Sequence, residues 1–346
     1  MDTPAWSATS AGGGSVVTSR ADQWILRAAD AWVRLTNRHL VRACRRHFGY
    51  VPDFARPRGH DALMQWRKLF DHNPLFVTFC DKPAARDWAL RRVPDLATAD
   101  IVWQGAGLDD LPAGVLTDDC VLKVNAGTGA NYFPGRGRWD ALTLRREFGC
   151  WLRRPRCGPG EWAYHQVPRR LLVERLIAPS GELIDLNLRC QDGEIASAFV
   201  GVNWKTPAAL GCYLTRDGQP FTPPDAALVE RLLRPGIFDR ASAVARQLSR
   251  GIDHVRVDFH VHGEALYLGE LTVYSSSGLG EEEQVGVGAL IERSWLEAID
   301  KSWFLSTPQP WPMSLYQGAF RRWVVERRRA LASGPATVPA PPAPAP

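Results

Sequence analysis

The most regular pattern of hydrophobic and polar positions lies between His254 and Tyr274. Hydrophobic and polar residues alternate up to His262 and again from Leu266, and Gly263-Glu264-Ala265 separates the two runs. Alternation with a period of two is typical of β-strands that bury one face. The pattern therefore predicts a β-hairpin with a three-residue loop.

Other segments show helical periodicity or short runs of strand-forming residues. Asp81 is a suitable N-cap and Pro83 suits a first helical turn, so Lys82 is expected at a helix start. The predicted helices are 21–48, 67–92, 225–250, 287–304 and 314–332. The predicted strands are 121–124, 171–177, 183–190 and 195–203.

The helix expected at 21–48 is amphipathic and basic. Trp24, Ala28, Trp32 and Leu35 share one face, and arginines supply its polar character. We expect this helix to pack on its own domain, with a membrane-surface helix as the alternative. Residues 1–20 and the Pro/Ala-rich residues 334–346 are expected to be a disordered leader and tail.

Symmetric pairing of the predicted hairpin places Asp258 opposite Glu270 and Arg256 opposite Thr272. All four side chains then project from one face, because side chains alternate along a strand. The other face is expected to pack through Val255, Val257, Phe259, Val261, Tyr267, Leu271 and Val273.

Two carboxylates directly opposite each other, Asp258 and Glu270, destabilise a sheet unless something compensates their charge. Mg²⁺ could do so, since it binds one or two carboxylates and completes its shell with water and phosphate oxygens. The alternative is that Arg256 alone neutralises the pair. His260 and His262 share this face and are left unassigned.

A glycine-rich turn follows the strand that carries Lys123. Gly127, Thr128 and Gly129 lie in this turn, and such turns bring backbone N–H groups close to an anion. The turn matches neither a Walker A nor a GxGxxG motif, so an ordinary hairpin turn is the alternative. Lys123 is the only lysine between Lys82 and Lys205. This isolated position favours a role for Lys123 in binding phosphate.

Glu174 lies inside the apolar run LLVERLI, where a carboxylate needs a partner. A nucleotide amine, a ribose hydroxyl or a neighbouring arginine could serve.

Composition adds little to this picture. A formal charge of +5 is too small to indicate nucleic acid as a partner. The seven cysteines lack zinc-type spacing, and the N-terminus lacks a secretory signal, which together favour a cytoplasmic protein.

Several segments, in this order, resemble the ATP-grasp enzymes and among them the TupA-like branch of teichuronopeptide biosynthesis. The segments are KLFDHNPLF, CDKPAARDW, VLKVNAGTGAN, LLVERLI, IDLNLRCQDGE and HVRVDFHVHGEALYLGELTVYSSSG. The resemblance implies an α+β fold in which two α+β subdomains clasp ATP. They would be a central subdomain at 116–205 and a C-terminal one at 206–333, preceded by a smaller helical and α/β region at 21–115.

The resemblance also implies roles for individual residues. Lys82, Lys123 and the Gly127 to Gly129 loop would contact the ATP phosphates. The hinge beside adenine would be formed by Glu174, Arg175 and Leu176, and the ribose contact would be Asp185 or Glu182. Arg256 and Lys205 would act on the transferring phosphoryl group, while Asp258 and Glu270 would hold Mg²⁺. Two departures stand out: Thr272 replaces a frequent Asn, and Asn187 replaces a frequent Lys.

By the same resemblance, the activity would be ATP-dependent ligation of a carboxylate to an amine through an acyl phosphate. The acceptor would be a small molecule or polymer that carries a carboxylate, in the assembly of a cell-surface polymer. One alternative is a kinase that phosphorylates a sugar. Another is a nucleotide-binding protein without turnover, associated with a membrane or with a biosynthetic complex.

Overall fold

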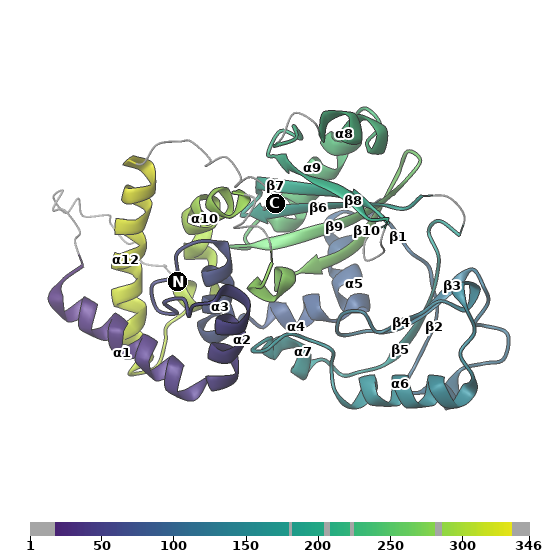
Figure 1. The fold of residues 1–346 in the computed structure, drawn as a ribbon, viewed down its shortest axis with the longest axis horizontal. Coiled ribbons are helices and arrows are strands. Elements are labelled where there is room, and N and C mark those ends of the chain that lie inside the picture. Colours follow the sequence, from purple (N-terminus) through teal and green to yellow (C-terminus); the bar gives the residue numbers. More distant parts are fainter. Residues whose placement is uncertain (1–17, 180–181, 204–207, 222–224, 281–285, 334–346) are drawn as a thin grey trace, which may run out of the picture.

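The computed structural model describes residues 18–179, 182–203, 208–221, 225–280 and 286–333. Two separate sheets dominate these residues (Figure 1). The large sheet has the order β1-β10-β9-β6-β7-β8 and the small sheet the order β2-β5-β3-β4. All neighbours are antiparallel except β1 and β10.

The large sheet contains the predicted hairpin. Its strands are β1 (Ala97–Thr98), β6 (Ile184–Gln191), β7 (Glu194–Val202), β8 (Leu210–Thr215), β9 (Val255–His262) and β10 (Ala265–Thr272). Helices α8 (Ala226–Leu232), α9 (Ile237–Ser249) and α10 (Val287–Ala298) pack against it. The single helix expected at 225–250 is divided, because Pro235 and Gly236 interrupt it.

The small sheet is formed by β2 (Ile101–Gly105), β3 (Cys120–Val124), β4 (Asn131–Tyr132) and β5 (Leu171–Arg175). Its core contains Leu122, Val173, Phe148 and Trp151, the last two from α6 (Ala141–Arg153). A short helix, α7 (Trp162–Gln166), precedes β5. The expected strand, glycine turn and strand around residues 121–133 are confirmed as β3 and β4.

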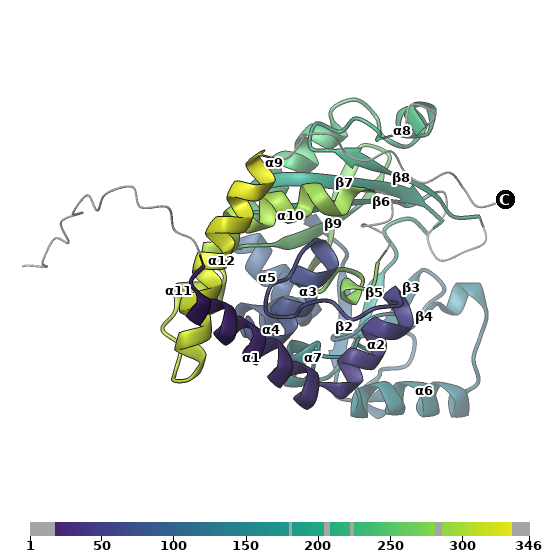
Figure 2. The ribbon, with the colours of Figure 1, turned by 60° about the vertical axis from the view of Figure 1, so that its left-hand side comes forward.

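Seven further helices complete the described residues; most of them lie at one side of the two sheets, whereas α4 and α5 contact β10 (Figures 1 and 2). They are α1 (Arg20–Thr36), α2 (Arg38–Phe48), α3 (His60–Phe70), α4 (Leu75–Cys80), α5 (Lys82–Arg92), α11 (Trp303–Ser306) and α12 (Met313–Ser333). The helices expected at 21–48, 67–92 and 287–304 are therefore each broken into shorter helices. No helix within these described residues is both long and apolar enough to cross a membrane.

Helix α1 packs on the protein as expected, against α12, but not through the face that carries Trp24 and Leu35. Trp24 and Leu35 are 69% and 68% exposed, whereas Leu26 and Val33 are buried. The helix has apolar residues on two opposite faces, and only one of them meets the protein. Of the leader expected at 1–20, residues 18–20 are described, and there Ser19 caps α1 and the helix begins at Arg20. The tail expected at 334–346 lies outside the described residues.

The hairpin forms with a different loop from the one predicted. Ala265 pairs with His262, so the loop has two residues, and a β-bulge at Gly269 follows. Beyond the bulge, Asp258 faces Glu270 and Arg256 faces Thr272 as predicted. The bulge changes the face of Tyr267, which pairs with His260 instead of lying on the apolar face. Val255, Val257, Phe259, Val261, Leu271 and Val273 are buried as expected.

Candidate functional site between the two sheets

The polar face of the large sheet carries two rows of paired residues. Asn187 on β6, Asp258 on β9 and Glu270 on β10 form one row. The next row includes Arg256 and Thr272. The sequence thus folds four of the predicted site residues into direct neighbours, and it places Asn187 beside Asp258.

A dense set of contacts joins these four side chains. Arg256 donates from Nε to Asp258 Oδ1 and from Nη2 to Asp258 Oδ2, both at 2.6 Å. The Thr272 hydroxyl lies 3.0 Å from Asp258 Oδ2 and 2.9 Å from Glu270 Oε1. Thr272 is therefore the polar link between the two carboxylates, a role that its sequence position alone did not reveal.

The two carboxylates differ in their electrostatic surroundings. Burial alone would raise the pKa of Glu270, but the charges of Lys82 and Arg256 and the hydrogen bond from Thr272 lower it to about 2. Burial raises the pKa of Asp258, although Arg256 opposes that shift. Glu270 is thus the ionised carboxylate that the surrounding cations stabilise most strongly.

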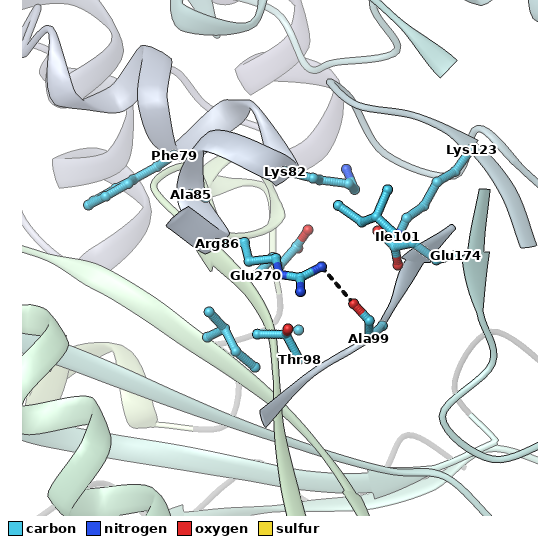
Figure 3. A pocket seen from close by; sticks show the side chains of 12 residues that line it. Phe79, Lys82, Ala85, Arg86, Thr98, Ala99, Ile101, Lys123, Glu174 and Glu270 are labelled. Carbon is cyan, nitrogen blue, oxygen red and sulfur yellow. Dashed lines mark hydrogen bonds and ion pairs between the residues drawn. The ribbon is translucent and has the colours of Figure 1, made fainter. Parts of the chain in front are cut away.

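A cavity separates Glu270 from the small sheet (Figure 3). Helix α5 contributes Lys82 and Arg86, and the small sheet contributes Lys123 and Glu174. The complete lining is Phe79, Lys82, Ala85, Arg86, Thr98, Ala99, Ile101, Lys123, Glu174, Leu268, Gly269 and Glu270. Four predicted site residues, Lys82, Lys123, Glu174 and Glu270, therefore meet in one cavity from four separate elements of the chain.

Lys82 begins α5 as predicted, but its neighbour Asp81 does not cap the helix with its side chain. The Asp81 carboxylate instead accepts hydrogen bonds from Asn125 Nδ2 at 2.9 Å and Arg170 Nη2 at 3.0 Å. Lys82 Nζ donates to the carbonyl oxygen of Gly127 at 3.0 Å, and burial lowers its pKa. The predicted phosphate lysine and glycine turn are therefore in direct contact.

Glu174 has the charged partner that the sequence required, and that partner is Lys123 instead of an arginine. Lys123 Nζ lies 2.5 Å from Glu174 Oε2 across β3 and β5. The expected alternatives were a nucleotide group or an arginine. This ion pair lies at the cavity wall, where the charges of the Lys123 ammonium and the Glu174 carboxylate compensate each other.

Arg156 holds the glycine turn in place. The Thr128 N–H donates to the Arg156 carbonyl oxygen at 2.9 Å, and Arg156 Nη1 donates to the Gly129 carbonyl oxygen at 3.1 Å. Gly127 has φ +112°, and a Cβ there would lie 2.9 Å from the Arg156 carbonyl oxygen. Only glycine fits this turn without strain.

Several expected nucleotide contacts lie away from the cavity lining. Arg175 Nη1 donates to Asp119 Oδ2 at 2.9 Å, and the Leu176 N–H donates to the Asp119 carbonyl oxygen. Asp185 Oδ1 lies 2.9 Å from Nδ1 of His260, a residue that sequence reasoning left unassigned. Lys205 lies outside the described residues.

Arg86 lines the cavity but was absent from the sequence prediction. Its Nη1 donates to the carbonyl oxygen of Ala99 at 2.9 Å, as Figure 3 shows. Arg86 is four residues after Lys82, a spacing that places both side chains on one helix face. That spacing is the signal that could have identified it.

The chemistry of its donor set decides whether the carboxylate pair suits Mg²⁺. Within the described part of the chain, no group of three or more His, Cys, Asp or Glu residues is arranged to hold a metal ion. Asp258 and Glu270 supply two carboxylates linked through Thr272. Such a pair fits Mg²⁺ that takes only one or two protein carboxylates and keeps its other positions for water and phosphate.

Known structures of ATP-grasp proteins resemble this chain at low identity. The D-alanine–D-alanine ligase of Bacillus anthracis, solved with ATP, is 16% identical with a TM-score of 0.35, covering 73% of this chain and 68% of that one. The L-amino acid ligase of Bacillus licheniformis is 13% identical with a TM-score of 0.40, covering 69% and 51%. The ATP-grasp ligase PsnB, solved with its minimal precursor, is 14% identical with a TM-score of 0.31, covering 71% and 66%.

Comparison with curated proteins finds no match. Comparison with protein families matches the TupA-like ATP-grasp model to residues 62–287. This range contains both sheets, the cavity and the carboxylate hairpin. It leaves out helices α1 and α2 at one end and α11 and α12 at the other. The chain therefore belongs to the TupA-like ATP-grasp family and has its α+β ATP-grasp fold.

Proposed function

We propose that this protein is an ATP-dependent ligase that joins a carboxylate to an amine, with ATP bound between the two sheets. The observation that carries the proposal is the cavity in which Lys82 and Lys123 lie across from Glu270. Cations on one wall and a carboxylate on the other suit a nucleotide polyphosphate with its divalent cation.

The lysines are the proposed phosphate ligands. In the structure Lys82 contacts the Gly127 carbonyl oxygen and Lys123 contacts Glu174. Phosphate oxygens would replace or share these partners, and the turn from Gly127 to Gly129 would lie over them. Glu174, Arg175 and Leu176 are proposed beside the adenine, with Asp185 or Glu182 at the ribose.

Asp258 and Glu270 would hold Mg²⁺, with Thr272 fixing the distance between them. A bound divalent cation would neutralise charge on the phosphate oxygens during phosphoryl transfer. Arg256 is proposed to stabilise the transferring phosphoryl group, since its guanidinium already lies against Asp258. Lys205, which lies outside the described residues, stays a prediction as an additional cation for phosphoryl transfer.

The proposed reaction has two steps. An oxygen of the acceptor carboxylate attacks the γ-phosphorus and the bond to the β-phosphate oxygen breaks, which yields an acyl phosphate and ADP. The amine then attacks the acyl carbon, loses a proton and displaces phosphate, so that an amide forms. The side chains named here position reactants and stabilise charge, and no protein nucleophile is needed.

We propose further that the acceptor is a small molecule or polymer that carries a carboxylate. The reaction would take place in the cytoplasm and serve the assembly of a cell-surface polymer. The family match supports this context. A sugar kinase on the same site remains the second candidate, because the phosphate-binding side chains would serve both reactions.

ADP formation in the presence of candidate carboxylates and amines tests the proposal, with mass spectrometry of the products. Glu270→Gln and Asp258→Asn should each lower turnover by about 10²–10³-fold. Glu264→Gln is the matched control, since Glu264 is an exposed carboxylate in the loop of the same hairpin. An amide product supports the ligase. A stable phosphorylated sugar would show that the protein is a sugar kinase and would overturn the ligase proposal.

Turnover also separates catalysis from nucleotide binding alone. If ATP binds but no substrate pool increases ADP formation above that of Glu270→Gln, the protein binds nucleotide without catalysing ligation. If Glu270→Gln and Asp258→Asn both retain full turnover, the carboxylate hairpin is not the reaction site.

A further inference from the structure

Helix α1 carries an exposed apolar face that nothing in the described structure covers. Trp24, Trp32 and Leu35 are 69%, 51% and 68% exposed. They recur at helical spacing with Ala28, so they lie on one side of the helix. The opposite side, with Leu26 and Val33, is buried within the protein.

Packing of α1 against the protein is complete without this face. Asp22 is buried and forms an ion pair with Arg322 of α12, and the Asp22 side chain also takes part in the N-terminal capping box with Ser19. Asp30 accepts hydrogen bonds from Arg34 and from the Phe54 N–H. Figures 1 and 2 show α1 at the periphery of the molecule, away from the two sheets.

The exposed charged residues of α1 and α2 have one sign. Arg20 and Arg27 are exposed on α1, and Arg27 lies 5.9 Å from the ring centroid of Trp24. Both acidic residues of α1 are engaged in the contacts above, and no exposed residue of the described segment 18–50 is acidic. Helix α2 adds exposed arginines at Arg38, Arg42, Arg45 and Arg46.

Tryptophans and a leucine flanked by arginines form the chemistry of a helix that lies in the interface of an anionic membrane. The indole rings are amphipathic and favour the headgroup level, while arginines bind anionic lipid phosphates. We propose that α1 docks the protein onto an anionic lipid surface through Trp24, Trp32 and Leu35.

This docking is independent of the proposed ligase activity. It concerns a helix outside the matched family range of residues 62–287 and outside the cavity. Failure of one proposal therefore leaves the other unaffected.

Cosedimentation of the full chain with lipid vesicles tests the docking. The protein should pellet with vesicles of phosphatidylcholine and phosphatidylglycerol at low salt, and pellet much less with pure phosphatidylcholine or at high salt. Trp24→Ser/Trp32→Ser should reduce the partition coefficient by roughly tenfold or more. Leu35→Ser should reduce it by a smaller factor.

Leu142→Ser is the matched control for Leu35→Ser. Leu142 lies on α6 and is 77% exposed, close to the 68% of Leu35. The control should bind vesicles like the wild type, and circular dichroism should show that every variant is folded. Absence of pelleting, or equal pelleting with neutral vesicles, overturns the proposal. A concentration-dependent dimer lost in Trp24→Ser/Trp32→Ser would show that a second copy covers this face and would also overturn it.

Discussion

Lys82 is the residue that most directly connects the two sides of the cavity. Its Nζ contacts the glycine turn, and its charge is the largest cationic contribution that lowers the pKa of Glu270. Burial of Lys82 also means that its ammonium must have anionic partners. A nucleotide phosphate in the cavity would be such a partner.

Lys82→Met should therefore weaken ATP binding. A hydrogen bond to a charged group contributes about 1.5–3 kcal/mol, so the dissociation constant should rise by roughly 10-fold to 100-fold. Isothermal titration calorimetry with a non-hydrolysable ATP analogue and Mg²⁺ measures this effect. Lys301→Met, at a half-exposed lysine paired with Asp192, should bind like the wild type. Equal affinities for Lys82→Met and Lys301→Met would contradict the role given to Lys82.

Asp71 is a second residue with a measurable consequence, remote from the cavity. It is fully buried, Oδ1 accepts from the Phe304 N–H, and Oδ2 has no hydrogen-bond partner among the described residues. Burial and the neighbouring Asp253 raise its pKa from 3.8 to about 7, against the effect of Arg67. The folded protein therefore holds a proton on Asp71 more tightly than the unfolded chain does.

This raised pKa predicts a pH-dependent contribution to stability. The contribution is present below about pH 4 and is lost as pH rises to about 7. Asp71→Asn keeps the Oδ1 acceptor and cannot ionise, so its stability should gain on that of the wild type over this window. Urea unfolding of both proteins at pH 5 and pH 8 measures the difference. A constant difference between the two pH values would show that Asp71 does not titrate in this range.

At the residue scale, the sequence predicted that the hairpin side chains meet, but it did not predict the partner of every polar residue. Period-two alternation and symmetric pairing placed Asp258 opposite Glu270, because register beyond the bulge agrees with that of a three-residue loop. The partner of Glu174 was missed, since the pairing of β3 with β5 is a long-range contact that no local pattern encodes. Arg86 was also missed, although its position four residues after Lys82 places both side chains on one helix face.

The hairpin of β9 and β10 is the element on which the site depends. Its two-residue loop would shift the register by one residue, and the bulge at Gly269 restores it before Glu270. A Cβ at Gly269 would lie 3.1 Å from the Asp258 carbonyl oxygen and 3.1 Å from His260 Nε2. A side chain at Gly269 would therefore be tight against both atoms, and the neighbouring groups would have to shift by a few tenths of an ångström to admit it.

Gly269→Ala should destabilise the protein by about 1–3 kcal/mol, the usual cost of overpacking, because the Asp258 backbone must move. The movement should also weaken binding of ATP with Mg²⁺. Gly107→Ala is the matched control, since Gly107 has extended backbone and nothing lies within 4 Å of its added Cβ. Thermal unfolding and nucleotide titration of both variants test this. Equal melting temperatures for the two variants would show that the bulge tolerates a side chain.

Sequence patterns located most elements but not their breaks or their partners. The helix expected at 21–48 divides at Asn37, and the helix at 225–250 divides at Pro235 and Gly236. Strand β1 was not predicted, because two residues cannot show a period and its parallel pairing with β10 joins distant parts of the chain. Tertiary contacts, which local propensity does not contain, decide such elements.

On the scale of the whole molecule, a short crossing joins the two sheets beside the cavity. Strand β1 belongs to the large sheet and β2 to the small one, with only Ala99 and Asp100 between them. Arg86 donates to the Ala99 carbonyl oxygen, and the Arg175 N–H donates to that of Asp100. The family resemblance indicated two subdomains from the order of motifs, but this crossing became visible only in the structure.

A ligand that contacts both sheets should stabilise the molecule as a whole. At a concentration 100 times its dissociation constant, ATP with Mg²⁺ should add about 2.7 kcal/mol to the free energy of unfolding, which corresponds to a rise in melting temperature of roughly 5 °C. Hydrogen exchange should slow in β3 and β5 of the small sheet and in β10 of the large sheet, because the cavity has walls from both. Helix α12 lies outside the cavity and should exchange at its original rate. Mg²⁺ alone is the control that separates ion binding at Asp258 and Glu270 from nucleotide binding. Protection confined to one sheet would mean that the nucleotide does not bridge the cavity, and the site proposed between the sheets would then be wrong.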